Sequence, residues 1–463
     1  MMHFLEPEII AAVGILATLV AAMLVRPRST VPYWFGLVFS AAALVRALTL
    51  QQHTHLYGGA VLGDSYSIVV TVFTLLAVMA GLLLAWDPER YGPEFPALMQ
   101  LAGVGAMVMG FAGNLILLFL GLELLSLPLY VLAASRRTSL GGEAGLKYLL
   151  IGAFSSGILL FGAALLYGAT GSMTFVNFTA VHVVPGLMAA GLGLLLVGLL
   201  YKLAIVPFHM WVPDVYEGSP TPVTAFMAFG TKVGAAAALL RVLAFGFSLS
   251  AAWWGLMLGY LAVLTMIAGN MVALPQRDLK RLLAWSGVGN AGYVLVGIAS
   301  HNVVGAQAAL FYLLPYGLAI LLAFTVVRIL EGREAAPVTL ASLKGLAYRQ
   351  PWLAVGFLVA MLSLAGIPLT AGFIGKFYLV RGAIAADQWG VAMGLVVATI
   401  VGLAVYFRPV QQMFAPGEGA TGRFTVGTGI VLAVAALGTL FIGIYPEPVL
   451  HAVIQSARFT WLH

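Results

Sequence analysis

The chain has 463 residues, of which 62% are hydrophobic and 8% are charged, and its mean hydropathy is +1.04. Soluble domains carry about 25% charged residues, so this composition excludes a water-soluble protein and predicts one that is embedded in lipid. The chain contains no cysteine, which excludes disulfides, thiolate zinc sites, cysteine-ligated iron–sulfur clusters and a cysteine nucleophile. The net charge of +6 is spread along the chain without a basic cluster, so it indicates membrane topology rather than nucleic-acid binding.

Fourteen apolar segments approach the length of about 20 residues that crosses a membrane. The predicted spans are 8–25, 32–50, 65–86, 96–111, 113–134, 146–168, 186–208, 221–245, 251–274, 282–300, 303–330, 352–382, 390–412 and 425–445. The first is expected to be a permanent anchor, because no basic region precedes it as in a cleaved signal. The connections are short and no phosphate-binding loop follows a strand, so we expect no soluble catalytic domain.

The distribution of lysine and arginine predicts the orientation in the membrane. Connections after odd-numbered spans hold 15 of the 22 lysine and arginine residues, whereas the other side holds Arg241, Arg381 and Arg458. Positive charge accumulates on the cytoplasmic side of membrane proteins. The odd-numbered connections are therefore predicted to be cytoplasmic, and both termini are predicted to face outward.

One carboxylate lies deep inside a predicted span. Glu123 has at least nine residues of span on either side, whereas the other carboxylates lie in connections or near span ends. An ionisable side chain at this depth costs several kcal/mol and indicates a functional site by default. The alternative is a structural ion pair that fixes the packing of helices.

Lys202 lies deep in the seventh span, five residues before Pro207. This proline cannot donate a backbone hydrogen bond and crowds the carbonyl of Leu203, so we expect the helix to open about one residue from the lysine. Broken helices at membrane depth are tolerated where they are packed in protein or line a wet cavity, and transporters build ion sites there. The combination favours a proton or ion site over a lysine that simply extends to the interface.

Two further lysines lie within spans. Lys232 is about ten residues into the eighth span, between Gly230 and Gly234, which allow close helix packing. Lys376 lies eight residues after Pro368 in the twelfth span. Spans 7 and 12 are thus both predicted to be broken at a proline, and each carries one lysine. Their separation by five spans is typical of inverted repeats that carry an ion site.

Glu123, Lys202, Lys232 and Lys376 together form a candidate proton pathway. Burial favours the neutral form of a lysine, whereas a nearby carboxylate favours the charged form. A Glu123–Lys202 pair is therefore expected to hold a proton and to release it through water toward the other two lysines. His209, beside the broken seventh span, is either a candidate relay or simply a histidine at a helix end. No metal-binding cluster is predicted.

The strings around these residues resemble one known family. They are LFLGLELLSLPLYVL around Glu123, YKLAIVPFHMWVPDVYEGSPTPVTAF from Lys202, RDLKRLLAWSGVGNAGY, and LSLAGIPLTAGFIGKFYLV around Lys376. They are similar to the antiporter-like subunits of proton-pumping NADH–quinone oxidoreductase (respiratory complex I), most closely the bacterial N type, the counterpart of mitochondrial chain 2. The resemblance extends from about residue 113 to residue 385. One position departs from it, since the family often has histidine where this chain has Asn290.

The resemblance implies an all-α polytopic fold of about 14 transmembrane helices, with two inverted five-helix repeats and discontinuous helices 7 and 12. The expected division is an N-terminal three-helix segment (1–95), a first repeat (96–245), a second repeat (251–412) and a C-terminal helix (425–463). It also implies half-channel roles for Glu123, Lys202, Lys232 and Lys376.

The function that the resemblance implies is proton translocation by a membrane-arm subunit of this translocase in the bacterial inner membrane. No cofactor is expected on this chain, because quinone, NADH, FMN and the iron–sulfur clusters belong to the whole complex. The expected partners are other membrane-arm subunits, including further antiporter-like chains. A subunit of a multisubunit monovalent cation/proton antiporter is the alternative, since it shares the glutamate and the lysines. A purely structural anchor would leave the midplane lysines and both helix breaks unexplained.

Overall fold

Helices occupy all fourteen predicted spans in the computed structural model, which describes residues 5–26, 28–50, 54–136, 138–179, 185–332 and 337–457. In this described part, twelve helices are long and apolar enough to cross a membrane, and two shorter apolar helices, α5 and α15, occupy the remaining predicted spans. The expectation of an all-α polytopic membrane protein is therefore confirmed.

The first part of the chain contains three long helices and a small hairpin. The elements are α1 (Glu6–Leu24), α2 (Val31–Leu48), β1 (Thr54–Leu56), β2 (Val61–Gly63), α3 (Ser65–Leu84) and α4 (Pro88–Tyr91). The strands β1 and β2 pair antiparallel, with His55 opposite Leu62. This hairpin is absent from the sequence-based prediction, because each strand has only three residues.

The next six helices correspond to the predicted first repeat. They are α5 (Phe95–Phe111), α6 (Leu115–Ala134), α7 (Ser139–Thr170), α8 (Pro185–Leu203), α9 (Val212–Gly218) and α10 (Thr221–Arg241). The seventh predicted span is split into α8 and α9. Helix α8 ends one residue after Lys202, and Ala204 then adopts a left-handed backbone with φ of 71°. The break at Pro207 is thus confirmed.

The remaining helices correspond to the predicted second repeat (251–412) and to the C-terminal segment (425–463). They are α11 (Ala251–Ala273), α12 (Leu279–Ala299), α13 (Val303–Glu331), α14 (Leu346–Arg349), α15 (Pro351–Ala365), α16 (Ala371–Ala385), α17 (Trp389–Phe414), α18 (Val426–Ile444) and α19 (Glu447–Ser456). The twelfth predicted span is split into α15 and α16 around Pro368, where Gly366 and Leu369 have φ of 82° and 70°. Short 3₁₀ or π turns cover 57–59, 175–179, 242–246, 248–250 and 340–343.

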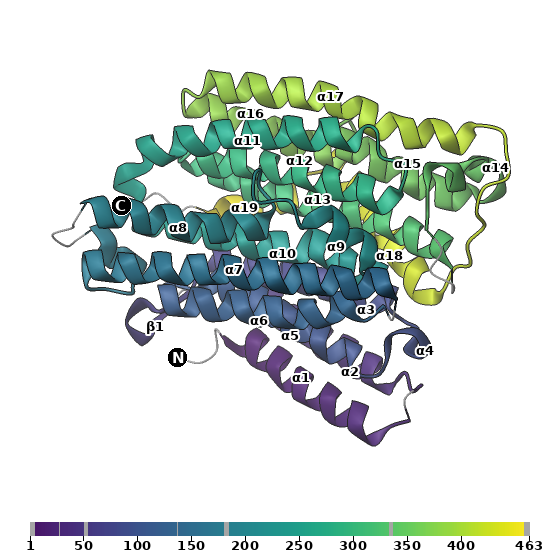
Figure 1. Ribbon diagram of the computed structural model, residues 1–463, viewed down its shortest axis with the longest axis horizontal. Coiled ribbons are helices and arrows are strands. Elements are labelled where there is room, and N and C mark those ends of the chain that lie inside the picture. Colours follow the sequence, from purple (N-terminus) through teal and green to yellow (C-terminus); the bar gives the residue numbers. More distant parts are fainter. Residues whose placement is uncertain are drawn as a thin grey trace.

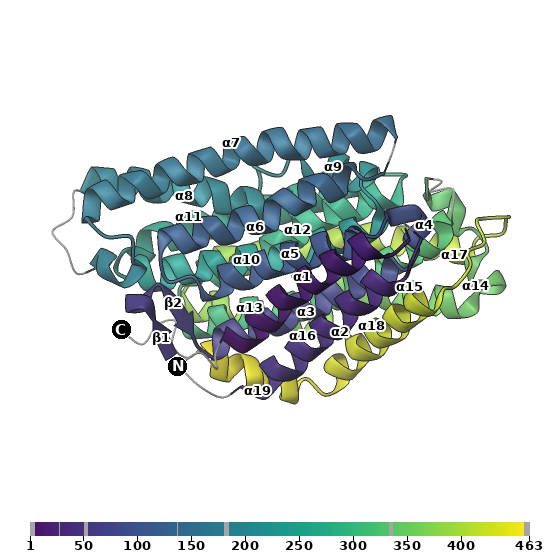
Figure 2. The same cartoon turned by 90° about the horizontal axis from the view of Figure 1, so that it is seen from below.

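The helices run roughly side by side, and α10, α12 and α13 lie at the centre of the bundle (Figure 1 and Figure 2). All 21 residues of α10 are buried, and 94% of the most apolar window of α12 and of α13 is buried. Helix α10, which carries Lys232 at membrane depth, is thereby kept away from lipid, where exposing a charge would be costly.

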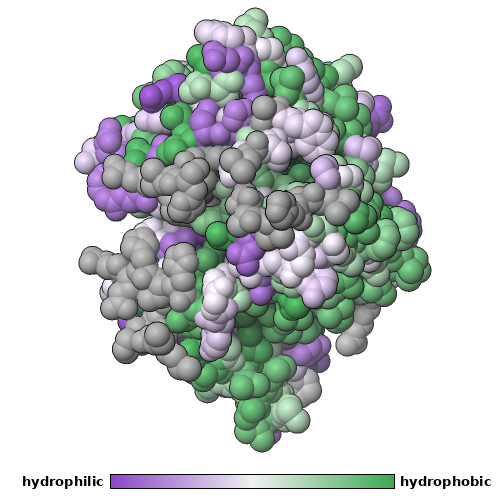
Figure 3. Space-filling model, turned by 90° about the vertical axis from the view of Figure 1, so that its left-hand side faces the viewer, coloured by the Kyte–Doolittle hydropathy of each residue, from purple (hydrophilic) through white to green (hydrophobic). Residues whose placement is uncertain are grey.

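The two ends of the bundle differ in the elements that cover them. The hairpin of β1 and β2 lies at one end together with α19, whereas α4 and α14 lie at the other (Figure 2). Seen from the hairpin end, hydrophilic and hydrophobic side chains are mixed, and hydrophobic ones dominate parts of the rim (Figure 3).

Arg241 occupies a different environment from the one expected. The sequence-based count assigns it to an outward connection, but it is the last residue of α10 and is 1% exposed. Its guanidinium donates to both carboxylate oxygens of Asp64, at 2.6 Å each. Such a bidentate pair satisfies two buried charges that would otherwise be costly. This ion pair joins α10 to the start of α3 at the hairpin end.

Candidate functional site

Lys202 lies in the last turn of α8 with 2% of its surface exposed. Its Nζ donates to Ser126 Oγ at 2.7 Å and to Tyr148 OH at 3.1 Å. The same ammonium lies 5.1 Å from the ring centroid of Tyr148 and 5.9 Å from that of Tyr130. Hydroxyl oxygens and aromatic faces, rather than a carboxylate, therefore surround this buried cation.

Glu123 lies on α6, one helical turn before Ser126. No ion pair joins it to Lys202 among the described residues, so the expected role of Glu123 in holding the Lys202 proton stays a prediction. Glu123 is only half-buried, yet its Oε1 is buried without a hydrogen-bond partner in the described part of the chain. Ser126, three residues after Glu123 on the same helix, is the residue of α6 that contacts the lysine.

Lys232 lies on the fully buried α10 and is 2% exposed. Its Nζ donates to the carbonyl of Leu203 at 3.2 Å and to that of Gly287 at 2.8 Å. The ring centroid of Tyr316 is 5.8 Å away. Leu203 is the last residue of α8, so Lys232 binds a carbonyl at the end of the broken seventh span.

Lys376 lies on α16 and is 6% exposed. Its Nζ donates to the carbonyls of Leu364 at 2.8 Å and Ala365 at 3.3 Å, which end α15. It also lies 4.5 Å from the ring centroid of Tyr293 on α12. Lys376 therefore binds the broken end of its own span.

The lysines share one arrangement at the two helix breaks. Lys232 binds the carbonyl terminus of α8 and Lys376 binds that of α15. A helix leaves its last carbonyls unpaired and carries partial negative charge there, so a cation at this position is stabilised. The two breaks are not fully equivalent, because Lys202 precedes its break whereas Lys376 follows its break.

His209 lies in the segment between α8 and α9 and is 8% exposed. Its ring packs edge-to-face on Trp285, with ring centroids 5.1 Å apart, and its Nδ1 is buried without a partner among the described residues. Among the described residues, the His209 side chain forms no hydrogen bond with Lys202, Lys232 or Lys376. Its role as a relay stays a prediction.

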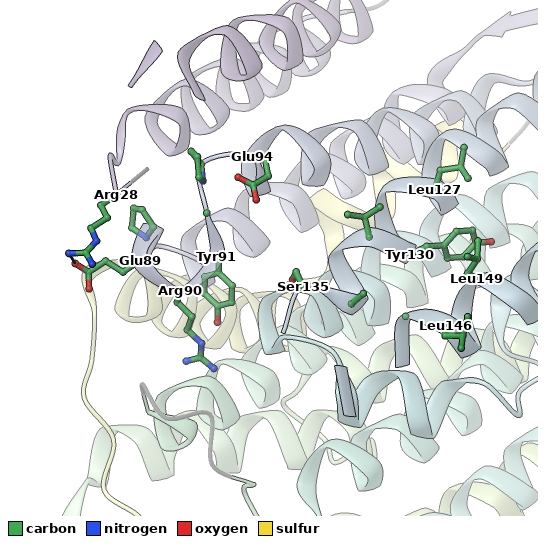
Figure 4. A pocket seen from close by; sticks show the side chains of 16 residues that line it. Arg28, Glu89, Arg90, Tyr91, Glu94, Leu127, Tyr130, Ser135, Leu146 and Leu149 are labelled. Atoms are coloured by element: carbon green, nitrogen blue, oxygen red, sulfur yellow. Dashed lines mark ion pairs between the residues drawn. The ribbon is translucent and has the colours of Figure 1, made fainter. Parts of the chain in front are cut away.

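A groove of about 1080 Å³ opens near α4 and extends along α6 and α7 (Figure 4). Arg28, Glu89 and Arg90 lie at one side of it, and Leu127 and Tyr130 lie farther along its wall. Tyr130 therefore lines the groove and also lies against Lys202, which is not itself one of the groove's lining residues.

Several of these contact residues are absent from the sequence-based site. Ser126 has a signal in the sequence, because it follows Glu123 by three residues and therefore shares its helix face. Tyr148, Tyr293 and Tyr316 have none, since each reaches its lysine only through the packing of helices that are distant in the chain.

The chain matches known proteins over almost its whole length. A family model described as "NADH:quinone oxidoreductase/Mrp antiporter, TM" matches residues 112–402. NADH-quinone oxidoreductase subunit N from Trichlorobacter lovleyi is 39% identical over 99% of this chain and 97% of its own length. The subunit of that name from Gemmatimonas aurantiaca is 41% identical over 87% of this chain and 80% of its own length.

Two solved structures share the fold. A chain of respiratory complex I from Thermus thermophilus, solved with bound aureothin, is 38% identical, with a TM-score of 0.86 over 97% of this chain and all of that chain. A chain of the Mrp complex from a Dietzia species is 22% identical, with a TM-score of 0.89 over 100% of this chain and 98% of that chain, which shows the fold alone. The family model and the relatives agree. The chain therefore belongs to the NADH:quinone oxidoreductase/Mrp antiporter family of membrane proteins, and within that family to the NADH-quinone oxidoreductase N subunits.

Proposed function

We propose that this chain conducts protons across the membrane as a membrane-arm subunit of NADH–quinone oxidoreductase, with Glu123, Lys202, Lys232 and Lys376 as the groups that carry them. The observation that supports this most directly is the set of three buried lysines at two broken helices. Each is held by hydroxyl, carbonyl or ring contacts, and none forms an ion pair with a described residue.

The surroundings of these lysines suit reversible protonation. A buried ammonium that is paired with a carboxylate is held in its charged form, whereas one without a carboxylate is costly to keep charged. Carbonyl and hydroxyl dipoles offset only part of that cost. The charged and neutral forms therefore lie closer in free energy than they do in water, so a proton can arrive and leave. Glu123 would shift this balance at Lys202 without touching it.

The energy for pumping has to come from other subunits. This chain has no cysteine to ligate an iron–sulfur cluster. We assign NADH, FMN, the iron–sulfur clusters and quinone to the rest of the complex. A half-buried Glu123 would face lipid in an isolated chain, which is costly. We therefore assign this face of α6 to a neighbouring membrane-arm subunit.

We further propose that the chain lies in the bacterial inner membrane with its α4 and α14 end in the cytoplasm and both termini outside. The excess of lysine and arginine in the connections at that end supports this orientation. We also propose that 96–245 and 251–412 are two inverted repeats, between the N-terminal segment (1–95) and the C-terminal helix (425–463). The matching breaks after α8 and α15 support that division.

A cation/proton antiporter subunit is the second candidate, supported by the shared fold of the Mrp chain. The relatives that share 39–41% identity over most of the chain favour the oxidoreductase. Purifying the tagged chain from its native membrane separates the two candidates. Flavin and iron–sulfur subunits that co-purify would support the oxidoreductase, whereas antiporter chains alone would overturn it.

Replacing Lys202 in the assembled complex tests the proton pathway. Lys202→Met keeps the length of the side chain and removes its charge, so we expect proton uptake into proteoliposomes to be abolished or strongly reduced, together with coupled NADH oxidation. Lys344→Met is the matched control, since Lys344 is exposed in the connection before α14. Unchanged proton uptake in assembled Lys202→Met complex would refute the assignment.

A further inference from the structure

Helix α12 contacts two of the buried lysines at positions six residues apart. The carbonyl of Gly287 accepts from Lys232, and the ring of Tyr293 lies against Lys376. Six residues correspond to about 9 Å along a helix. Asn290 lies midway between these two positions, is 1% exposed and carries no charge. The polar side chains around Asn290 therefore stand between the two lysines.

Three hydroxyl groups surround Asn290. Its Nδ2 donates to Tyr406 OH at 3.1 Å, and its Oδ1 accepts from Tyr312 OH at 2.6 Å. Tyr406 OH also shares a hydrogen bond of 2.8 Å with Ser286 Oγ. All four side chains are at most 3% exposed. Tyr406 comes from α17, more than one hundred residues along the chain from Asn290.

The amide and the hydroxyls differ in what they can do with a proton. A hydroxyl can accept one proton and release another, so it can pass a proton along a hydrogen-bonded chain. The amide nitrogen of asparagine only donates, and its oxygen only accepts. Asn290 therefore orders the three hydroxyls but interrupts any direct passage of a proton from Tyr312 through Asn290 to Tyr406.

We propose that the Tyr406 hydroxyl, together with Ser286, carries protons past Asn290 between Lys232 and Lys376. In this step Lys232 loses one proton and Lys376 gains one, while each hydroxyl accepts a proton from one side and releases one to the other. Water bridges the ends of the relay, and Asn290 holds the Tyr406 hydroxyl in place. This inference rests on the proposed function, since it needs the two lysines to exchange protons.

The test compares variants of the assembled complex in proteoliposomes, with proton uptake measured per complex. Tyr406→Phe removes only the hydroxyl, and we expect it to lower proton uptake about fivefold, the effect of one lost hydrogen bond on a rate. Tyr260→Phe is the matched control, because Tyr260 lies on α11 with 59% of its surface exposed. Equal proton uptake by the two variants would overturn the proposal.

A second substitution separates a relay from a merely structural tyrosine. Imidazole both accepts and donates a proton, so Asn290→His added to Tyr406→Phe should restore proton uptake to within about twofold of the unsubstituted complex. Asn290→Leu added to Tyr406→Phe should not restore it. Recovery in both double variants, or in neither, would contradict the relay. Lys376→Met is measured in parallel: if it pumps normally, the proposed function itself has failed, whereas a failure confined to Tyr406→Phe counts against this inference alone.

Discussion

At the scale of single residues, the partners of Lys202 distinguish its site from those of the other two lysines. Lys202 is held by side-chain hydroxyls on α6 and α7, whereas Lys232 and Lys376 are held by backbone carbonyls. A hydroxyl can rotate to donate or accept, but a carbonyl only accepts. Lys202 therefore has surroundings that can adapt to its neutral form, which suits its proposed role as a group that gains and loses a proton.

Ser126→Ala tests this difference. The substitution removes the closest hydrogen bond of Lys202 and leaves Tyr148 as its remaining polar partner. We expect proton uptake per assembled complex to fall about fivefold, because one net hydrogen bond is worth about 1 kcal/mol. Ser135→Ala is the control, since within the described ranges its hydroxyl bonds to the carbonyl of Leu132, one turn earlier at the end of α6, and contacts none of the three lysines. Equal uptake in the two variants would contradict a role for Ser126.

The helix breaks could be predicted from the sequence, because a proline has no backbone N–H to donate and its ring crowds the preceding turn of a helix. Pro207 and Pro368 cannot continue a helix, and both breaks lie where they were expected. The partners of the lysines could not be foreseen in the same way. The contact of Asn290 with Tyr406 joins residues 116 positions apart, and no local pattern specifies it. Arg241 illustrates the same limit, because its burial depends on Asp64 in a distant helix.

At the scale of elements, the two breaks combine a free helix end with a strained backbone. Ala204 follows α8 and Leu369 precedes α16, and both adopt the left-handed region that side chains disfavour. Non-glycine residues in this region cost about 1–3 kcal/mol and cluster at functional sites. The surrounding helices hold both segments in place, so the unpaired carbonyls stay available to the lysines.

Gly366→Ala should disturb the second break. Gly366 has φ of 82°, and a Cβ there would lie 2.9 Å from Cδ of Lys376. Because the chain must strain and Lys376 must move, we expect a loss of proton uptake of about tenfold, equivalent to about 1.4 kcal/mol. Gly429→Ala is the matched control, since a Cβ on α18 at that position meets open space. Normal uptake by assembled Gly366→Ala complex would show that the position of Lys376 matters little.

At the scale of the whole molecule, Glu331 joins the two proposed repeats at the α4 end. Its carboxylate lies 3.1 Å from Lys280 and 3.4 Å from Arg90, and it accepts from Thr221 at 2.7 Å. These partners belong to α12, α4 and α10, and the Glu331 side chain is 2% exposed. The buried carboxylate of Glu331, at the end of α13, thus links that helix to α4, α10 and α12.

Glu331→Gln should weaken the whole subunit. Breaking a buried ion pair leaves its cations unpaired and costs about 3–5 kcal/mol, whereas an exposed pair contributes at most about 1 kcal/mol. We expect a clear fall in the thermal unfolding midpoint of the purified complex. Glu89→Gln is the control, because Glu89 and its partner Arg28 are 55% and 79% exposed at the surface. A similar midpoint for both variants would show that the cluster is dispensable for stability.

The whole-molecule architecture was the part most accessible from the sequence. Hydropathy identifies each long helix because lipid demands about 20 apolar residues per crossing. The small elements escaped prediction, since α4 and α14 have four residues each and no comparable periodic signal. The partners of Lys202 also escaped prediction, because Ser126 and Tyr148 lie on α6 and α7, 76 and 54 positions away along the chain.

The bond between Lys232 and the end of α8 has a mechanical consequence. A charged lysine binds a carbonyl roughly twice as strongly as a neutral amine does. Under the proposed function, loss of the Lys232 proton weakens the hydrogen bond to the last carbonyl of α8, and return of the proton restores that bond. Lys202 lies at that same end of α8, one residue from the bonded carbonyl. The charge on Lys232 would thus set how firmly the end of α8, which carries Lys202, is held in place.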